Sequence, residues 1–161
     1  ELGRRLNRVE EADAYLSGTS SMIAGFRTRL KNRASRPVFI ISIGDARHFR
    51  AFGVDSMFGD VAVRLGFNNA WDGKSSYSAA APVGLEALAR VPEAAIIIVG
   101  PVPREAGKVL PQSALWNALP AVKAGRVAIL DPVNHFGGLP AARRFARLLA
   151  NAMFGPDRVN G

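Results

Sequence analysis

Two histidines and a few neighbouring carboxylates are the residues of this chain with the types needed for acid–base or metal chemistry. His48 follows Asp45 in one predicted turn, and His135 follows Asp131 in another. Imidazole and carboxylate groups can hold a divalent metal or transfer protons, but nothing in this spacing demands either chemistry. The sequence has no cysteine, which excludes disulfides, thiol nucleophiles and cysteine metal ligands. One interpretation of these residues is a small α/β enzyme or nucleotide-binding domain that uses His48 and His135 with the nearby aspartates. It is the alternative to a binding function that uses the loops between the predicted elements.

Common catalytic and phosphate-binding motifs do not occur in the sequence. Gly73-Lys74-Ser75 lacks the upstream glycine that a phosphate-binding loop requires, and no Gly-x-Gly-x-x-Gly follows the first strand-like run. No Gly-x-Ser-x-Gly nucleophile turn is present either. Enzyme activity is therefore the weaker interpretation, and the loops between the predicted elements are the better candidates for function.

Length and composition indicate one folded domain of moderate size. The 161 residues, 48% of them hydrophobic and 21% charged, are sufficient for a substantial core. The longest apolar run, residues 94–99, has the length of a strand and is far short of the roughly 20 residues that span a bilayer. The net charge is +8, and basic residues crowd the first 33 positions with few aromatic residues among them. Nucleic-acid binding is therefore not expected, whereas the charge is compatible with an anionic ligand or membrane surface.

Hydrophobic spacing predicts helices that alternate with strands. A long helix is expected over residues 10–32, because apolar residues recur there every three or four positions. Strands are predicted at 38–43, within 47–52, at 94–99 and at 127–130, and further helices at 56–65, 85–90 and 139–153. This alternation indicates the α/β class, with a mostly parallel sheet flanked by helices.

Loops that follow the predicted strands are the candidate binding elements, because ligands of open α/β sheets gather beyond the carboxyl ends of the strands. Residues 44–50, 68–82, 100–105 and 131–138 qualify. Their side chains combine aromatic, amide and cationic groups, which suit a bulky, partly apolar ligand bound without turnover. The candidate ligand-binding residues are Arg47, Trp71, Tyr77, Asn134, His135 and Phe136.

Several aromatic and charged residues also have a purely structural interpretation. Trp71 belongs to a residue type that usually packs in a core, and Arg47 can pair with a nearby aspartate. We expect His48 to be a turn residue whose hydrogen bonds are satisfied locally. Trp116 is expected to pack its short helix on the sheet.

Three segments of the sequence resemble one known family. "LWNALPAVKAGRV" (115–127) places Pro120 at the end of a short helix and Gly125 at the end of a second turn, before an apolar strand. It resembles the C-terminal region of the substrate-binding proteins of ABC importers for ferric siderophores, haem and cobalamin. "GDARHFRAFGVDSMFGDVAVRLGFNNAW" (44–71) is similar to a segment of periplasmic ferric-hydroxamate-binding proteins, and "GLEALARVPEAAIIIVG" (84–100) continues the match in order.

The resemblance implies a non-enzymatic protein with two α/β lobes that hold a ligand between them. Residues 1–34 would be the helix that connects the lobes, and residues 35–161 the C-terminal ligand-binding lobe. The ligand would be an Fe(III)–siderophore complex or a related chelate, with no resident cofactor. The partners would be ABC permease subunits and the N-terminal lobe, which is missing here. The protein would be periplasmic, either free or lipid-anchored.

Carried over residue by residue, the resemblance assigns aromatic loop residues to the ligand. Tyr77 occupies a position at which the family presents an aromatic ring, whereas Ser78 replaces the adjacent Trp of the hydroxamate binder. Asn134-His135-Phe136 stands where that binder has Trp-Phe-Tyr. The loss of two indole rings implies a smaller or more polar ligand.

A surface carboxylate also has a counterpart in the family. Glu86, early in the predicted helix 85–90, matches a position at which these lobes dock on a permease arginine. The positive end of the helix dipole also favours a carboxylate there, by about 0.3–1 kcal/mol. Both interpretations of Glu86 are open at this level.

Overall fold

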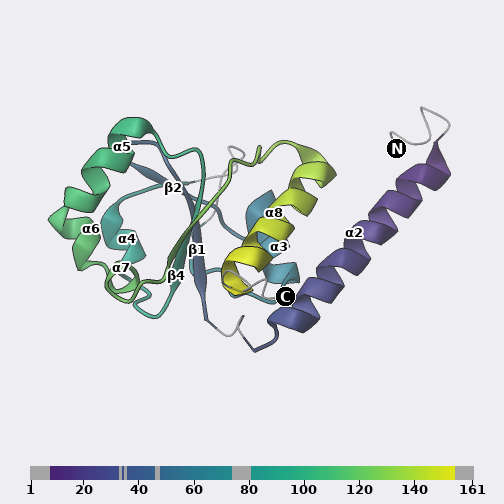
Figure 1. The fold of residues 1–161 in the computed structure, drawn as a ribbon, viewed down its shortest axis with the longest axis horizontal. Coiled ribbons are helices and arrows are strands. Elements are labelled where there is room, and N and C mark those ends of the chain that lie inside the picture. Colours follow the sequence, from purple (N-terminus) through teal and green to yellow (C-terminus); the bar gives the residue numbers. More distant parts are fainter. Residues whose placement is uncertain (1–7, 33, 35, 46–47, 74–80, 155–161) are drawn as a thin grey trace, which may run out of the picture.

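The computed structural model describes residues 8–32, 34, 36–45, 48–73 and 81–154. Within them, a five-stranded sheet lies between two helical layers, and one long helix runs along the outside of one layer (Figure 1). The strands are β1 (Val38–Ile43), β2 (Phe49–Ala51), β3 (Ala81–Val83), β4 (Ala95–Val99) and β5 (Val127–Leu130). The helices are α2 (Val9–Leu30), α3 (Met57–Arg64), α4 (Leu85–Leu88), α5 (Arg104–Val109), η1 (Leu110–Gln112), α6 (Ala114–Ala118), α7 (Pro120–Lys123) and α8 (Gly138–Phe154).

The sheet is parallel on one side and antiparallel on the other. Its strands lie in the order β3-β2-β1-β4-β5. β4 pairs in parallel with both β1 and β5, whereas β2 runs antiparallel to β1 and β3. The α/β class and the parallel arrangement of the longest strands are confirmed. The antiparallel edge was not anticipated, because residues 81–82 were assigned to a loop. Pro82 lies in the outer strand β3, where the missing N–H is tolerated.

Alternating side chains along the central strands build two separate cores. Ile40 and Ile97 face α2, α3 and α8, whereas Ile41 and Ile98 face α4 to α7. All four are buried. Because β1 and β4 are covered on both faces, their sequences are apolar throughout.

The predicted helices are present, with ends shifted by one or two residues. The prediction that the loop extends from 100 to 105 is wrong at its C-terminal end, because α5 begins at Arg104. Pro103 is compatible with the start of a helix, and Gly107 lies within α5 at an exposed position. Ala106 is the residue that holds α5 on the second core, with 1% of its surface exposed.

The segment around Trp116 has the structure expected from its sequence. Trp116 is buried and stacks on Phe49, with ring centroids 6.2 Å apart. Gly125 follows α7 with a φ of +64°, a conformation that favours glycine, and β5 starts two residues later. Trp116 is therefore part of the scaffold that positions β5.

Helix α2 packs on α8 mainly through its C-terminal half. Met22 and Phe26 are partly buried against the core beneath α8, and Leu30 is fully buried. In the N-terminal half, Val9 and Leu16 are exposed. Among the described residues, no helix combines the length and apolar character that a membrane span requires.

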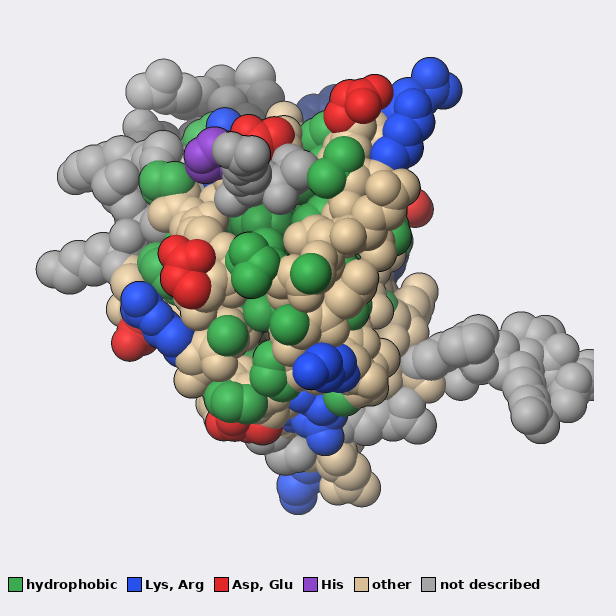
Figure 2. All heavy atoms as spheres, turned by 90° about the vertical axis from the view of Figure 1, so that its left-hand side faces the viewer, with side chains coloured by type: hydrophobic (Ala, Val, Ile, Leu, Met, Phe, Trp, Pro, Cys, Tyr) green, Lys and Arg blue, Asp and Glu red, His purple; other side chains and the backbone are tan. Residues whose placement is uncertain are grey.

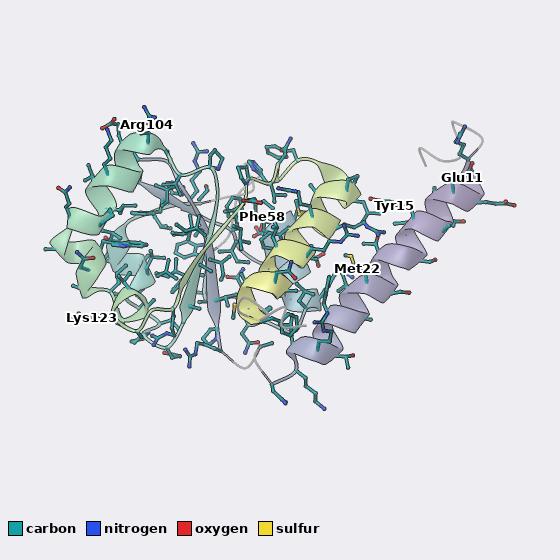
Figure 3. The ribbon with its side chains drawn as sticks, in the orientation of Figure 1. Glu11, Tyr15, Met22, Phe58, Arg104 and Lys123 are labelled. Carbon is teal, nitrogen blue, oxygen red and sulfur yellow. The ribbon has the colours of Figure 1, made fainter. Side chains whose placement is uncertain are left out.

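One arginine of α8 fixes the middle of α2. The Arg143 guanidinium lies 4.6 Å from the centroid of the Tyr15 ring, and its Nη1 donates to Thr19 Oγ1 at 3.0 Å. Figure 3 shows Tyr15 and Met22 on the side of α2 that faces α8, whereas Glu11 points away. The helix is therefore attached to the domain along one face only.

Candidate ligand-binding face

The loops after β1, β4 and β5 leave the sheet at one end, the upper end in Figure 1, because these strands are parallel. Helix α2 enters β1 from the opposite end. The carboxyl end of the sheet is where ligands of such folds gather. The loop between β5 and α8, residues 131–137, belongs to this end and contains three of the candidate residues.

Asn134 shapes the loop between β5 and α8. Its Oδ1 accepts a hydrogen bond from the Phe136 N–H at 2.9 Å, and its main-chain oxygen accepts one from the Gly137 N–H at 3.0 Å. Such a side-chain turn fixes the chain locally. Phe136 is thereby presented to the surface with 69% of its area exposed.

His135 joins this exposed ring to the core beneath it. Its imidazole centroid lies 4.2 Å from that of Phe136, 5.8 Å from Phe52 and 6.3 Å from Phe58. Phe52 and Phe58 are buried, and Phe58 packs in turn on Phe145 of α8 at 4.5 Å. The structure therefore brings His135 and Phe136 together, as the outer end of a column of aromatic rings.

The carboxylates near the two histidines form separate local contacts. His48 Nδ1 lies 2.8 Å from Asp45 Oδ2, and the His48 main-chain N–H donates to Asp45 Oδ1 at 2.8 Å. This is the turn role expected of His48. Asp131 lies 3.6 Å from the guanidinium of Arg144. Within the described ranges, no three histidine, aspartate or glutamate side chains come close enough to share a metal.

Trp71 lies on the other side of the sheet from His135. It packs against the core beneath α4 to α7, and its main-chain N–H donates to Asn69 Oδ1 at 2.9 Å. Gly73 folds over the indole, where an added Cβ would lie 2.5 Å from Trp71 Cζ2. The indole Nε1 is buried and has no hydrogen-bond partner in the part of the chain that is described. Trp71 and Phe136 thus belong to different faces, which favours the packing interpretation of Trp71.

Two of the candidate residues, Arg47 and Tyr77, lie outside the described residues. Ser78 does so as well.

Glu86 lies near the start of α4 and is exposed. Its carboxylate folds over the preceding turn, so that a Cβ added at Gly84 would lie 2.3 Å from Glu86 Oε1. Beside it is a shallow apolar hollow of about 230 Å³ between α4 and α6, lined by Leu85, Ala89, Leu115, Ala118 and Leu119. Figure 2 shows hydrophobic side chains across the middle of this face, with charged side chains toward its borders.

Leu115 is a surface residue that the sequence reasoning missed. It is 71% exposed, the largest exposure among the large hydrophobic residues of the described chain. A signal was available, because neighbouring residues of a helix point about 100° apart, so that Leu115 points sideways when Trp116 points at the sheet.

The described residues form an α/β domain with an aromatic loop at the carboxyl end of its sheet and a long helix along one side. The chain belongs to the periplasmic binding protein family, whose model matches residues 1–133. It is 28% identical over 155 residues to the iron(3+)-hydroxamate-binding protein FhuD of Escherichia coli (strain K12), a match that covers 96% of this chain and 52% of that protein.

Solved structures share the fold. The Fe3+–Desferal-bound siderophore-binding protein FhuD from Vibrio cholerae has a TM-score of 0.87 at 21% identity, over 96% of this chain and 58% of that chain. The triscatecholate siderophore-binding protein FeuA from Bacillus subtilis, complexed with ferri-bacillibactin, has a TM-score of 0.75 at 19% identity, over 92% and 55% of the two chains. The chain therefore spans about half the length of the relatives that it matches.

Proposed function

We propose that this chain is the C-terminal lobe of a periplasmic protein, free or lipid-anchored, that captures a ferric siderophore or related iron chelate for an ABC importer. Residues 35–161 are the ligand-binding lobe, and residues 1–34 carry the helix that connects it to an N-terminal lobe. The observation that carries the proposal is the exposed Phe136 ring at the carboxyl end of the sheet, supported from below by His135. The similarity to ferric-hydroxamate and ferric-siderophore binders supports it.

Binding in this proposal relies on a surface that is ordered before the ligand arrives. Asn134 fixes the main chain of the loop, and His135 rests on buried rings, so little side-chain freedom is lost when Phe136 packs on a chelate. The iron is cargo held by its chelator, and the protein contacts the organic shell. Arg47, Trp71 and Tyr77 are kept as candidate contacts, with Trp71 in the less favourable position.

The connecting role of α2 rests on its one-sided attachment. Arg143, Met22 and Leu30 hold it to this lobe, whereas Val9 and Leu16 stay exposed in its N-terminal half. In the two-lobed protein, these exposed side chains pack against the second lobe. A helix fixed in this way allows only small closure on ligand binding.

Titration with ferric chelates tests the proposed function. The full-length protein that contains this chain is titrated with ferric desferrioxamine, a ferric tris-catecholate, haem and cobalamin, while tryptophan fluorescence is recorded. We expect saturable quenching with at least one ferric siderophore and none with its iron-free chelator. If none of the ferric chelates gave a saturable response, the proposal would be contradicted.

Substitution of Phe136 is expected to weaken chelate binding. Phe136→Ala removes the exposed ring, and aromatic contacts contribute about 0.5–1.5 kcal/mol beyond their buried area, so we expect roughly tenfold weaker binding. Leu115→Ala is the matched control, because Leu115 is exposed to a similar degree on another face. If the two variants bound the ferric chelate with equal affinity, Phe136 would not be part of the binding site.

Docking on the permease is proposed to use Glu86 and the adjoining apolar hollow. Glu86 forms no ion pair with any described residue, and Leu115 stands exposed beside it. This combination suits a permease loop that presents a basic side chain next to an apolar one. The fold of this chain leaves the Glu86 carboxylate exposed to water.

Charge reversal at Glu86 tests the docking proposal. We expect Glu86→Arg to slow association with the permease in proteoliposomes about tenfold at low salt, because interfacial charges act mainly on the association rate. Chelate affinity should not change. Glu93→Arg, at another exposed carboxylate, is the control and should associate at the normal rate. Normal association of Glu86→Arg would exclude this docking role.

A further inference from the structure

Strand β5 forms an outer edge of the described sheet and has unused main-chain groups. The main-chain oxygens of Arg126 and Leu130 accept hydrogen bonds from the N–H groups of Ile96, in β4, and of Gly100, just after it. Because bonding residues alternate along a parallel strand, the peptide groups of Val127 and Ile129 point away from β4. Those outward groups have no partner in the described part of the chain. They offer donors and acceptors at the spacing of a β-strand.

The strand itself carries no charged or proline side chain of the kind that often prevents strand pairing. β5 consists of Val, Ala, Ile and Leu, without proline or charge, and Ile129 is 66% exposed. Arg126, just before the strand, is held back over the turn that precedes β4. Its Nη2 donates to Pro92 O at 2.5 Å and its Nε to Ala94 O at 3.3 Å. The guanidinium therefore does not cover the edge.

A hollow lies on each face of the sheet beside this strand. On the face of α5 to α7, about 280 Å³ is enclosed mainly by apolar side chains, among them Val102, Trp116 and Ile129. On the face of α8, about 440 Å³ is lined by Ala128 and Met153 and other residues. Successive side chains of a strand point to opposite faces, so a strand added to β5 would send alternate side chains toward the two hollows.

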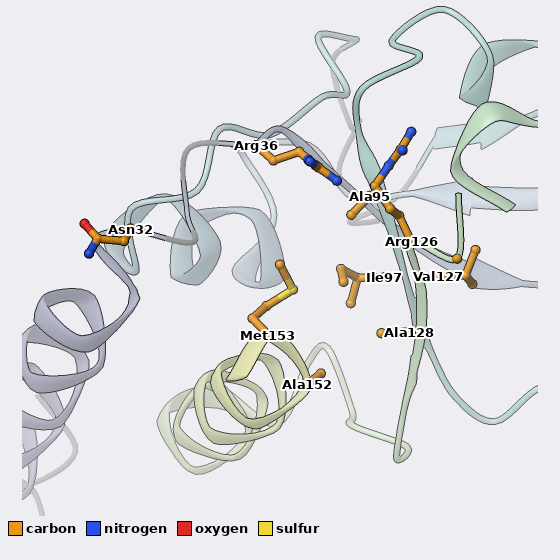
Figure 4. A pocket seen from close by; sticks show the side chains of 10 residues that line it. Asn32, Arg36, Ala95, Ile97, Arg126, Val127, Ala128, Ala152 and Met153 are labelled. Atoms are coloured by element: carbon orange, nitrogen blue, oxygen red, sulfur yellow. The ribbon is translucent and has the colours of Figure 1, made fainter. Parts of the chain in front are cut away.

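Charge favours an acidic occupant for this edge. Figure 4 shows the side chains of Arg36 and Arg126 together at one end of the larger hollow, with Met153 along its side. Neither arginine pairs with a carboxylate among the described residues. A second copy of this chain is a poor occupant, since each copy carries a net charge of +8.

We propose that the β5 edge accepts an extended segment of another polypeptide by strand addition. Apolar side chains of that segment enter the hollow beside Trp116, and its acidic residues lie beside Arg36 and Arg126. Main-chain hydrogen bonds to Val127 and Ile129 supply affinity, and the hollows supply selectivity.

Short synthetic peptides test the proposal in both strand directions. The probes are acetylated, amidated Asp-Glu-Val-Thr-Val-Thr-Val and its reversed sequence, added to the 15N-labelled 161-residue chain. We expect one of them to shift the amide signals of Val127 and Ile129 in a saturable way. The same peptide with lysine in place of both acidic residues should bind about tenfold more weakly.

Variants of the β5 edge distinguish strand addition from nonspecific peptide binding. Ile129→Pro removes an outward N–H without removing a bond to β4 and should weaken peptide binding about tenfold. Ile129→Lys, at an exposed side chain, is the second variant if the proline variant does not fold. Arg36→Gln should weaken only the acidic peptide.

Several outcomes would overturn the proposal. The first is that neither peptide shifts the amide signals, or that the shifts are confined to α4 and α6. The second is that the lysine peptide binds as tightly as the acidic one. The third is that the Ile129 variants bind the peptide as tightly as the unchanged chain. A dimer of the free chain whose interface is β5 would also overturn it, because a second copy would then be the occupant.

Discussion

Phe58→Ala is expected to lower the free energy of unfolding by about 3–5 kcal/mol, the range for a buried phenylalanine replaced by alanine. Phe58 is 1% exposed and contacts Phe52, Phe145 and His135 through their rings. Its removal leaves a cavity where α3, α8 and the candidate binding loop meet (Figure 3). Urea unfolding followed by circular dichroism measures the change.

The same variant links the core to the candidate site. Because His135 loses one of the rings beneath it, we expect its NMR signals to shift together with those of Phe136. Phe58→Leu, which keeps most of the volume, is the control and should cost much less. A loss below about 1 kcal/mol for Phe58→Ala would show that the aromatic column does not support this loop.

Gly59→Ala is expected to destabilise the domain by about 3 kcal/mol, the upper end of the usual cost of overpacking, because the packing leaves no space for a methyl group. A Cβ at Gly59 would lie 1.9 Å from the main-chain oxygen of Gly53. That oxygen cannot move freely, since it accepts hydrogen bonds from Ser56 Oγ at 2.7 Å and from the Ser56 N–H at 3.0 Å. Thermal or urea unfolding of the variant measures the loss.

The same substitution at Gly25 is the matched control. Gly25 lies within α2, and a Cβ there would meet nothing within 4 Å. Alanine is the better helix former by up to about 1 kcal/mol, so Gly25→Ala should stabilise the chain slightly. Similar losses at both glycines would mean that the contact between Gly59 and Gly53 is not the cause.

Local periodicity was sufficient to predict most of the elements, because helices and buried strands impose their spacing on neighbouring residues. The long helix, the strand at Val38–Ile43 and the final helix all followed from it. Strand β3 could not be predicted, since three residues that include Pro82 carry no periodic signal. Its formation depends on pairing with β2, which is a contact between distant segments.

The position of the candidate loop could be predicted from the sequence, but the packing of its side chains on the core could not. Residues 134–136 were expected at the carboxyl end of a strand, and they lie there. That His135 rests on buried rings depends on how α3 packs against α8. Trp71 was grouped with the same site, but a bridge between Asn69 and Val38 anchors its segment beside the start of β1. The indole consequently enters the other core, and no local pattern carries that information.

The central proposal is that the carboxyl end of this sheet is one wall of a ferric-chelate site. High-spin Fe(III) broadens nearby NMR signals, so adding a ferric siderophore to the 15N-labelled full-length protein that contains this chain locates the site directly, with the gallium complex as the diamagnetic reference. We expect selective broadening at Asn134 to Gly137 and at the end of β4. Signals of Gly125 and Val127, at the opposite end of the sheet, should stay sharp. Broadening centred on that opposite end, or none at saturating chelate, would contradict the proposal.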